Sequence, residues 1–239
     1  IVGIIDTGID YTHPAFRRSD GSTRIIRLWD QTLESAQNPG AMPLVDYGRV
    51  YTNEDINRAL SAQDPYGEVP SRDTLGHGTF LAGIAAGSED VANDFIGAAP
   101  RADIAVVKLK PAKEYLRQFY LIRDGVPAYQ ENDIMAGVSF LFRLSQHLGK
   151  PVSICIGLGT NSGDHSGGSY ISRFLDMAGT LAGVCITCAG GNEAGRGCHY
   201  LGRLEDAMEY TEVELRVGAD EKGFVTELWA RGRDIYSVG

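Results

Sequence analysis

An acid, an imidazole and an amide stand in three glycine-containing segments where side chains of their type could act on a substrate. Asp6 closes the apolar run IVGIID, His77 lies between two glycines in GHGT, and Asn192 follows two glycines in GGNE. A helix N-terminus disfavours a protonated histidine, so His77 would need a partner carboxylate to hold the imidazolium that forms in catalysis. The amide N–H₂ group of an asparagine can donate to a developing oxyanion.

Each segment, taken alone, has an ordinary structural explanation. Asp6 could cap the turn after its strand, and Asn192 could simply occupy a turn. A lone histidine is usually structural, although one inside GHGTFLAG is less often so. Aspartic proteases also use DTG, but they need a second such motif and are mostly antiparallel, and this chain shows neither feature. The combination is therefore far more specific than any one segment.

Strands and helices alternate along the first 189 residues. Short apolar runs predict strands and amphipathic or small-residue patterns predict helices. The predicted strands lie at 1–6, 25–29, 102–108, 151–158 and 184–189, and the predicted helices at 53–62, 76–87, 133–148 and 169–181. Asn53 and Ser169 are the expected N-caps of their helices. This order predicts a doubly wound α/β fold, with a mostly parallel sheet, helices on both faces, and Asp6 at the edge where such sheets bind ligands.

The pattern changes after about residue 205. The segment 211–217 alternates polar and apolar residues strictly, and 224–229 follows beyond a glycine turn, which is typical of antiparallel strands. We therefore divide the chain into a partial α/β domain, 1–205, and the start of a β-rich domain, 206–239. The abrupt opening and the unfinished β segment predict a fold that is incomplete at both ends.

Composition argues against several classes of partner. The 239 residues are 43% hydrophobic and 22% charged, an ordinary globular balance, and the net charge is −9. There is no run of Lys or Arg, which argues against nucleic acid. No apolar stretch reaches the roughly 20 residues that span a bilayer. We expect no membrane partner and no cofactor.

The four cysteines do not predict a metal site. Cys185 and Cys188 form a CxxC, but they lie in a predicted buried strand, where side chains three apart point to opposite faces. A second CxxC is absent, and the acids of 90–103 show no calcium-loop spacing. We expect Cys155, Cys185, Cys188 and Cys198 to be free, buried thiols and predict no metal.

Together the three motifs resemble those of the subtilases, the subtilisin-like serine proteases. Asp6 matches the family's acid in DTGID, His77 its histidine in GHGTxxAG, and Asn192 the asparagine of its GNE-like motif, with one residue more or changed before it. The resemblance implies that Asp6 orients His77, that His77 acts as general base and then general acid, and that Asn192 helps bind the oxyanion.

A fourth segment, IGLG, resembles the family strand whose backbone pairs with an extended substrate. The resemblance assigns substrate binding to Gly157, Leu158 and Gly159, and Gly157 stands where serine is common in the family. The implied substrate is a peptide or a protein.

The catalytic serine that the resemblance requires is missing from its expected place. The family's serine lies in a GTS-like motif at the start of a helix after the asparagine segment, and no such motif follows Asn192. Ser237 lies in DIYSVG with no predicted helix after it, and every other serine precedes Asn192. The chain is thus expected to be an inactive fragment of a protease or a non-catalytic relative.

Longer stretches narrow the resemblance to the Csp-type subtilases of clostridia and related anaerobes. GIDYTHPAFRRSDGSTRIIRLWDQT and GLGTNSGDHSGGS carry it. In that group a jelly-roll-like β domain is inserted between the asparagine and serine segments, which implies that 206–239 begins this domain and that the serine comes after it. The resemblance also implies a bacterial protein, spore-associated or secreted, with a propeptide or β domain beyond this chain.

Two other functions stay open. A pseudoprotease would bind or regulate a partner, for example in spore germination, and would lack the serine motif in the rest of the protein. A doubly wound binding protein of flavodoxin type, with coincidental motifs, would hold Asp6 and His77 beyond hydrogen-bond reach.

Overall fold

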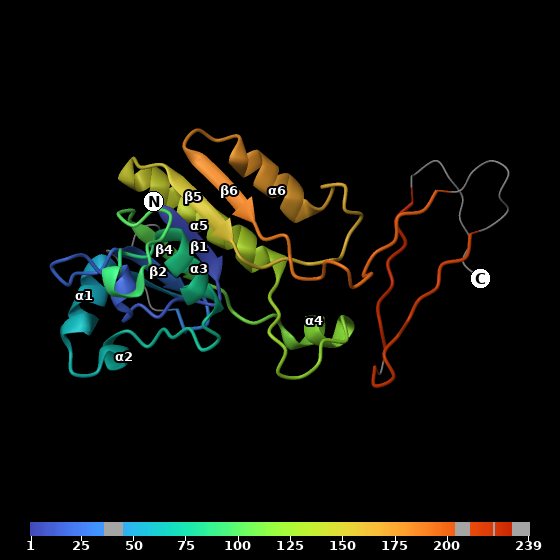
Figure 1. Cartoon of the computed structure of the whole chain (residues 1–239), viewed down its shortest axis with the longest axis horizontal. Helices are drawn as coiled ribbons and strands as arrows, with labels where there is room; N and C mark the ends of the chain where they lie inside the picture. The colour runs from blue at the N-terminus through green and yellow to red at the C-terminus, as the bar shows by residue number, and fades with distance from the viewer. Residues whose placement is uncertain (36–44, 204–210, 222, 231–239) are drawn as a thin grey trace.

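A single six-stranded sheet forms the centre of the computed structural model, which describes residues 1–35, 45–203, 211–221 and 223–230 (Figure 1). The strands run in the order β3-β2-β4-β1-β5-β6. Their bounds are β1 Val2–Asp6, β2 Ile25–Asp30, β3 Arg49–Thr52, β4 Ile104–Lys108, β5 Val152–Ile156 and β6 Val184–Cys188. Neighbouring strands pair in parallel, except for the edge strand β3, which is antiparallel to β2. The predicted mostly parallel α/β sheet is confirmed.

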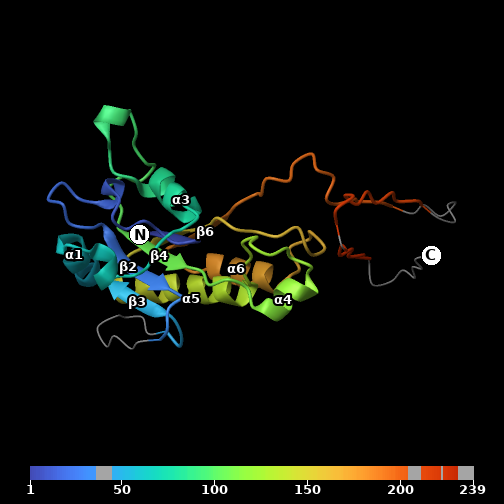
Figure 2. The ribbon, with the colours of Figure 1, turned by 90° about the horizontal axis from the view of Figure 1, so that it is seen from below.

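Helices cover both faces of the sheet, as Figure 2 shows. α1 and α3 pack on one face, and α5 and α6 on the other. The helices are α1 Asn53–Ser61, α2 Pro65–Glu68, α3 His77–Ala86, α4 Glu114–Phe119, α5 Glu131–Leu148 and α6 Tyr170–Gly179, with 3-10 turns at Pro14–Phe16 and Val91–Asn93. Among the residues that the structure describes, no helix is long and apolar enough to cross a membrane.

The central strand β1 is apolar on both sides because both sides are covered. Ile4 lies in the core cluster that includes Ala82 of α3, and Ile5 lies in the opposite cluster, which includes Leu141 of α5. All four side chains are fully buried. Burial of one such isoleucine is worth about 1.5–3 kcal/mol. This two-sided packing explains the continuous apolar run before Asp6.

The N-cap of helix α1 lies one residue earlier than the sequence predicted. Thr52, not Asn53, is the N-cap: its hydroxyl accepts from the Asp55 N–H (3.3 Å), and the Asp55 carboxylate accepts from the Thr52 N–H (2.9 Å). This reciprocal pair satisfies two backbone donors at the start of the helix. Asn53 instead donates its amide to the carbonyls of Thr23 and Ile25. The predicted cap of α6, Ser169, is confirmed, because its hydroxyl accepts from the Ser172 N–H.

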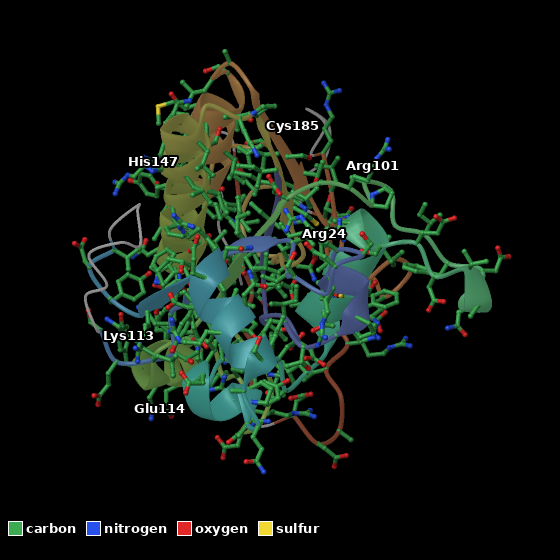
Figure 3. The ribbon with its side chains drawn as sticks, turned by 90° about the vertical axis from the view of Figure 1, so that its left-hand side faces the viewer. Arg24, Arg101, Lys113, Glu114, His147 and Cys185 are labelled. Carbon is green, nitrogen blue, oxygen red and sulfur yellow. The ribbon has the colours of Figure 1, made fainter. Side chains whose placement is uncertain are left out.

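A buried arginine fixes the C-terminal end of α3. Arg24, labelled in Figure 3, is 4% exposed. Its guanidinium donates to four main-chain carbonyls, those of Ala15, Ala86, Pro100 and Ala102. Ala86 is the last residue of α3, and a cation there complements the negative end of the helix dipole. The helix that begins at His77 is thus anchored at its other end.

The two strands predicted near the C-terminus are not present in the structure. The residues described at 211–217 and 224–229 carry no strand and are exposed, although their side chains alternate. A β-strand needs a hydrogen-bonded neighbour, and the described residues offer these segments none. In Figure 1 the described residues beyond about 195 extend away from the sheet. The division into 1–205 and 206–239 stays a prediction, and part of the second range lies outside the described residues.

The expectation of buried cysteines is wrong for this sheet edge. Cys185, labelled in Figure 3, and Cys188 are exposed, as is Cys198, and Cys155 is half-buried. β6 is the last strand of the sheet, so it has a neighbour on one side only. The apolar run of β6 resembles that of an inner strand, and its position at the edge could not be read from its composition.

Candidate active site

Asp6 occupies the carboxyl end of a central strand. β1 lies between β4 and β5, and Asp6 is its last residue. The side chain is fully buried. The Thr7 N–H donates to Asp6 Oδ1 over 2.7 Å, and Oδ2 has no hydrogen-bond partner among the described residues. A buried carboxylate with one unpaired oxygen is costly unless a specific partner justifies it.

His77 is the ionisable partner of this carboxylate, at Oδ1. Its Nδ1 lies 2.7 Å from Asp6 Oδ1. An ionised carboxylate can only accept, so Nδ1 carries the proton in this contact and Nε2 of the neutral imidazole keeps its lone pair. The His77 side chain is 47% exposed while that of Asp6 is 0% exposed. The buried acid therefore fixes the tautomer of an imidazole that remains accessible. A flavodoxin-like protein with Asp6 and His77 far apart is excluded by this distance.

Glycines bring the helix that carries His77 against the strand that carries Asp6. Gly76 precedes α3 with a φ of 77°, a left-handed conformation that glycine adopts without strain. Gly78 sits against the turn after β1, because a Cβ on it would lie 2.2 Å from the Gly8 carbonyl oxygen. The GHG sequence is therefore a steric requirement for the contact between the two segments.

Gly157, the first residue of the segment 157–159, lies directly beside the acid. The Gly157 N–H bonds to the Ile5 carbonyl (3.4 Å). A Cβ on Gly157 would come within 2.1 Å of Asp6 Oδ2 and 2.2 Å of the Leu81 side chain. β5 ends at Ile156, so Leu158 and Gly159 lie beyond the strand that was predicted to include residue 158. The glycine at 157 is thus imposed by the buried carboxylate.

Asn192 lies past the end of β6 and is exposed. Because β5 and β6 are parallel, the residues after both strands emerge at the same edge of the sheet, and the Ala189 N–H bonds to the Ile156 carbonyl (3.0 Å). The Asn192 N–H donates to the Glu193 carboxylate over 2.8 Å. The structure brings Asp6, His77 and Gly157 together, whereas no hydrogen bond in the described residues joins Asn192 to them.

The negative charge of Asp6 acts on two half-buried groups nearby. Burial raises the pKa of Tyr129, and the charges of Asp6 and Asp73 raise it further. Burial also raises the pKa of the Cys155 thiol, the Asp6 charge adds to this, and a hydrogen bond with Thr187 opposes it. A nucleophilic cysteine needs a lowered pKa. The shift of the Cys155 pKa thus runs opposite to the one that activates a cysteine.

The described residues offer His77 no serine partner and hold no metal-binding cluster. No serine hydroxyl in them hydrogen-bonds His77, and Ser237 lies outside them. No group of three or more His, Cys, Asp or Glu side chains in this part of the chain could hold a metal ion.

Sequence reasoning missed two residues that touch the segments of Asp6 and His77. Thr7 directly follows Asp6, and Asp73 stands four residues before His77. The Thr7 hydroxyl donates to Asp73 Oδ1 over 2.8 Å. Each residue was visible as a further polar side chain in its motif, Thr7 in DTG and Asp73 in DTLGHGT. No local sequence rule, however, connects a threonine with an acid 66 positions away.

The chain was compared with known families and structures. The sequence profile of the subtilase family matches residues 1–212. Among solved structures, the CspB protease of Clostridium perfringens is 34% identical, with a TM-score of 0.67, over 81% of this chain and 36% of that one. The S41 psychrophilic protease and sphericase are each 20% identical over 80% of this chain, with TM-scores of 0.48 and 0.47 and coverage of 45% and 46% of their own chains. This chain thus spans about a third of the length of the CspB protease. No curated protein matches it.

Proposed function

This chain belongs to the subtilase family, and on that premise we propose that it is the Asp- and His-bearing part of a serine endopeptidase. Membership of this protease family implies a peptide or protein substrate. The observation that carries the proposal is the 2.7 Å contact between His77 Nδ1 and Asp6 Oδ1. A buried carboxylate that orients a half-exposed imidazole is the arrangement in which histidine serves as general base.

In the proposed reaction, a serine oxygen attacks the peptide carbonyl while His77 takes the hydroxyl proton at Nε2. Asp6 stabilises the imidazolium that forms. The proton then passes to the leaving amine as the C–N bond breaks. Water repeats the two steps, releases the new carboxyl end and restores the serine. Each cycle consumes one water molecule and returns His77 to its starting protonation state.

We assign the remaining site residues to substrate and oxyanion. Gly157, Leu158 and Gly159 are proposed to pair their backbone with an extended peptide, and the position of Gly157 beside Asp6 supports this. Asn192 is proposed to donate its side-chain amide to the oxyanion. Loss of one such donor in subtilisin lowers kcat by about 10²–10³-fold. The exposed position of Asn192 at the edge shared with Gly159 is compatible with that role.

The nucleophile is proposed to come from a part of the protein outside these 239 residues. Two observations support this: no serine in the described residues bonds His77, and the chain spans about a third of the CspB protease. We propose that residues 206–239 begin an inserted domain that separates the Asn192 segment from this serine.

A fluorophosphonate probe, which labels activated serines, tests the proposal. The 239-residue chain alone is expected to give no labelling and no peptide hydrolysis. The full product of its gene is expected to be labelled at one serine, and H77A is expected to abolish that labelling. His147, an exposed histidine on α5 (Figure 3), provides the matched control H147A, which should label normally.

Two outcomes would contradict the proposal. Labelling of a serine within the 239-residue chain would show that the nucleophile lies inside it. A full product that folds but is never labelled would indicate the alternative function, a pseudoprotease that binds or regulates a partner. This alternative is supported by one observation: no serine in the described residues is hydrogen-bonded to His77.

A further inference from the structure

The carboxylate of Asp73 collects four hydrogen bonds between the two segments that carry the dyad. Oδ1 accepts from the Thr7 hydroxyl (2.8 Å) and the Gly76 N–H (2.9 Å). Oδ2 accepts from the Thr79 N–H (2.9 Å) and the Thr79 hydroxyl (2.7 Å). Asp73 itself lies outside the helix, four residues before His77. One half-buried acid thus ties the start of α3 to the turn after β1.

Two threonines extend the reach of this carboxylate to both sides. Thr7 donates to Asp73 and accepts from the Gly78 N–H over 2.9 Å. Thr7 directly follows Asp6, and Gly78 directly follows His77, so this bridge joins the neighbours of the dyad in the two segments. Thr79 forms a second bridge, because its hydroxyl donates to Asp73 and accepts from the Asp10 N–H over 2.8 Å.

The chemistry of the network requires an ionised acid at 73. A hydroxyl has one proton to donate. Thr7 and Thr79 each accept from a backbone N–H, so each directs its proton at the Asp73 carboxylate. Four donors point at Asp73, and a carboxylate accepts all four. Burial would raise the pKa of Asp73, but hydrogen bonds from Thr79, Thr7 and Gly76 outweigh it and hold the pKa below its usual value.

We propose that Asp73 is a positioning residue that holds Asp6 and His77 at hydrogen-bond distance. No hydrogen bond among the described residues joins Asp73 to the imidazole or to the Asp6 carboxylate, so it acts through Thr7, Thr79 and the backbone. The inference rests on the proposed function of the dyad, since positioning matters only if the His77–Asp6 contact is used. A placement error of 1 Å in such a contact can cost 10²-fold in rate, by the order of magnitude known for misplaced catalytic groups.

The test measures the dyad contact directly in the 239-residue chain. An imidazole N–H in a short, charge-assisted hydrogen bond gives a far-downfield proton resonance, which can be assigned to His77 with H77Q. In D73N one acceptor oxygen becomes an amide that opposes two donors. We expect the His77 Nδ1–H resonance of D73N to move upfield or to vanish through exchange while the remaining spectrum stays dispersed.

Matched variants separate positioning from general stability. D90N alters an acid that accepts from Ala92 and Asn93 within its own turn, and it should leave the His77 resonance unchanged. T7V removes the bridging hydroxyl at constant shape and should reproduce D73N, whereas T7S keeps the hydroxyl and should restore the wild-type resonance. If D73N does not fold, the comparison of the His77 resonance in T7V and T7S tests the proposal.

The outcomes distinguish this inference from the proposed function. A normal His77 resonance in folded D73N and T7V would overturn the role of Asp73 and leave the dyad intact. Absence of the downfield resonance from the wild-type chain would instead contradict the Asp6–His77 contact, and with it the proposed function. A change in T7V that T7S also shows would assign the effect to the fold rather than to the hydroxyl, and would overturn the inference as well.

Discussion

At the scale of single residues, Asp6 and His77 combine opposite environments in one contact. The acid is fully buried and the imidazole side chain is 47% exposed. His77 opens α3, where the helix dipole opposes a cation. Only a negative group in direct contact can offset that cost, and Asp6 Oδ1 at 2.7 Å supplies it. The residue pair therefore makes chemical sense only as a unit, because each member occupies a place that is unfavourable for it alone.

Gly157 provides a residue-scale prediction. In G157A, the new Cβ would collide with Asp6 Oδ2 and Leu81, and overpacking of this kind costs about 1–3 kcal/mol. We expect the free energy of unfolding, measured by urea titration, to fall by that amount and the His77 Nδ1–H resonance to shift. G179A, at a glycine with nothing within 4 Å of its Cβ position, is the control. Equal stability of G157A and G179A would contradict the steric requirement.

At the same scale, the motifs identified the contacting pair, Asp6 and His77, but not its surroundings. Asp6 and His77 could be found from the sequence because glycines and small residues flank them in a recognisable order. The need for glycine at 157 could not, because it follows from a tertiary contact with Asp6 Oδ2. Gly157 stands where serine is common in the family, and the structure gives this difference a steric cause.

At the scale of elements, α3 is held at both ends by charged side chains. Asp73 accepts from Gly76 and Thr79 at the N-terminal end, and Arg24 donates to the Ala86 carbonyl at the other. Negative charge at the start and positive charge at the end both complement the helix dipole. α3 lacks a side-chain hydrogen bond from its N-cap residue, Gly76, so these tertiary contacts supply what local sequence does not.

Removal of the anchor at the C-terminal end of α3 is predicted to weaken the whole fold. R24M would leave up to four carbonyls without their donor, and an unsatisfied buried polar group costs about 1–3 kcal/mol. We expect a fall in unfolding free energy of at least that size by urea titration. R101M changes an exposed arginine in the same region (Figure 3) and should stay within about 0.5 kcal/mol of wild type. Indistinguishable variants would contradict the anchoring role.

Elements with a strong period were predictable, and several short elements were not. The helix at 131–148 and the strands that flank it carry clear apolar patterns and were found within about two residues of their ends. β3, α2 and α4 have four to six residues each, too few for a pattern to stand out. The predicted strands at 211–217 and 224–229 had the right alternation, but alternation does not create the partner strand that β-structure needs.

At the scale of the whole molecule, packing is concentrated before residue 189. Both core clusters are built from residues of the sheet and its helices up to Ile186. Beyond Cys188 the described residues form no helix or strand. Past the Ala189 N–H, which bonds to the Ile156 carbonyl, their contacts with the preceding residues include the exposed ion pair of Arg123 with Glu221, the bond from the Gly163 N–H to Glu227 and the ring contact of His165 with His199. Exposed ion pairs contribute little to stability, so the C-terminal segment should open far more easily than the sheet.

Limited trypsin digestion tests this uneven stability. Cleavage requires an exposed segment that can adopt an extended conformation, so regions without secondary structure are cut first. Arg196, Arg203 and Arg216 are exposed and lie outside helices and strands, and we expect the first cuts there, as identified by mass spectrometry of the fragments. The remaining body should keep the His77 Nδ1–H resonance, since the side-chain hydrogen bonds around the dyad join residues between 6 and 79, and the Asp6 carbonyl accepts from Leu109, beside β4. First cuts inside the sheet, or loss of that resonance with the C-terminal segment, would show that the segment stabilises the dyad.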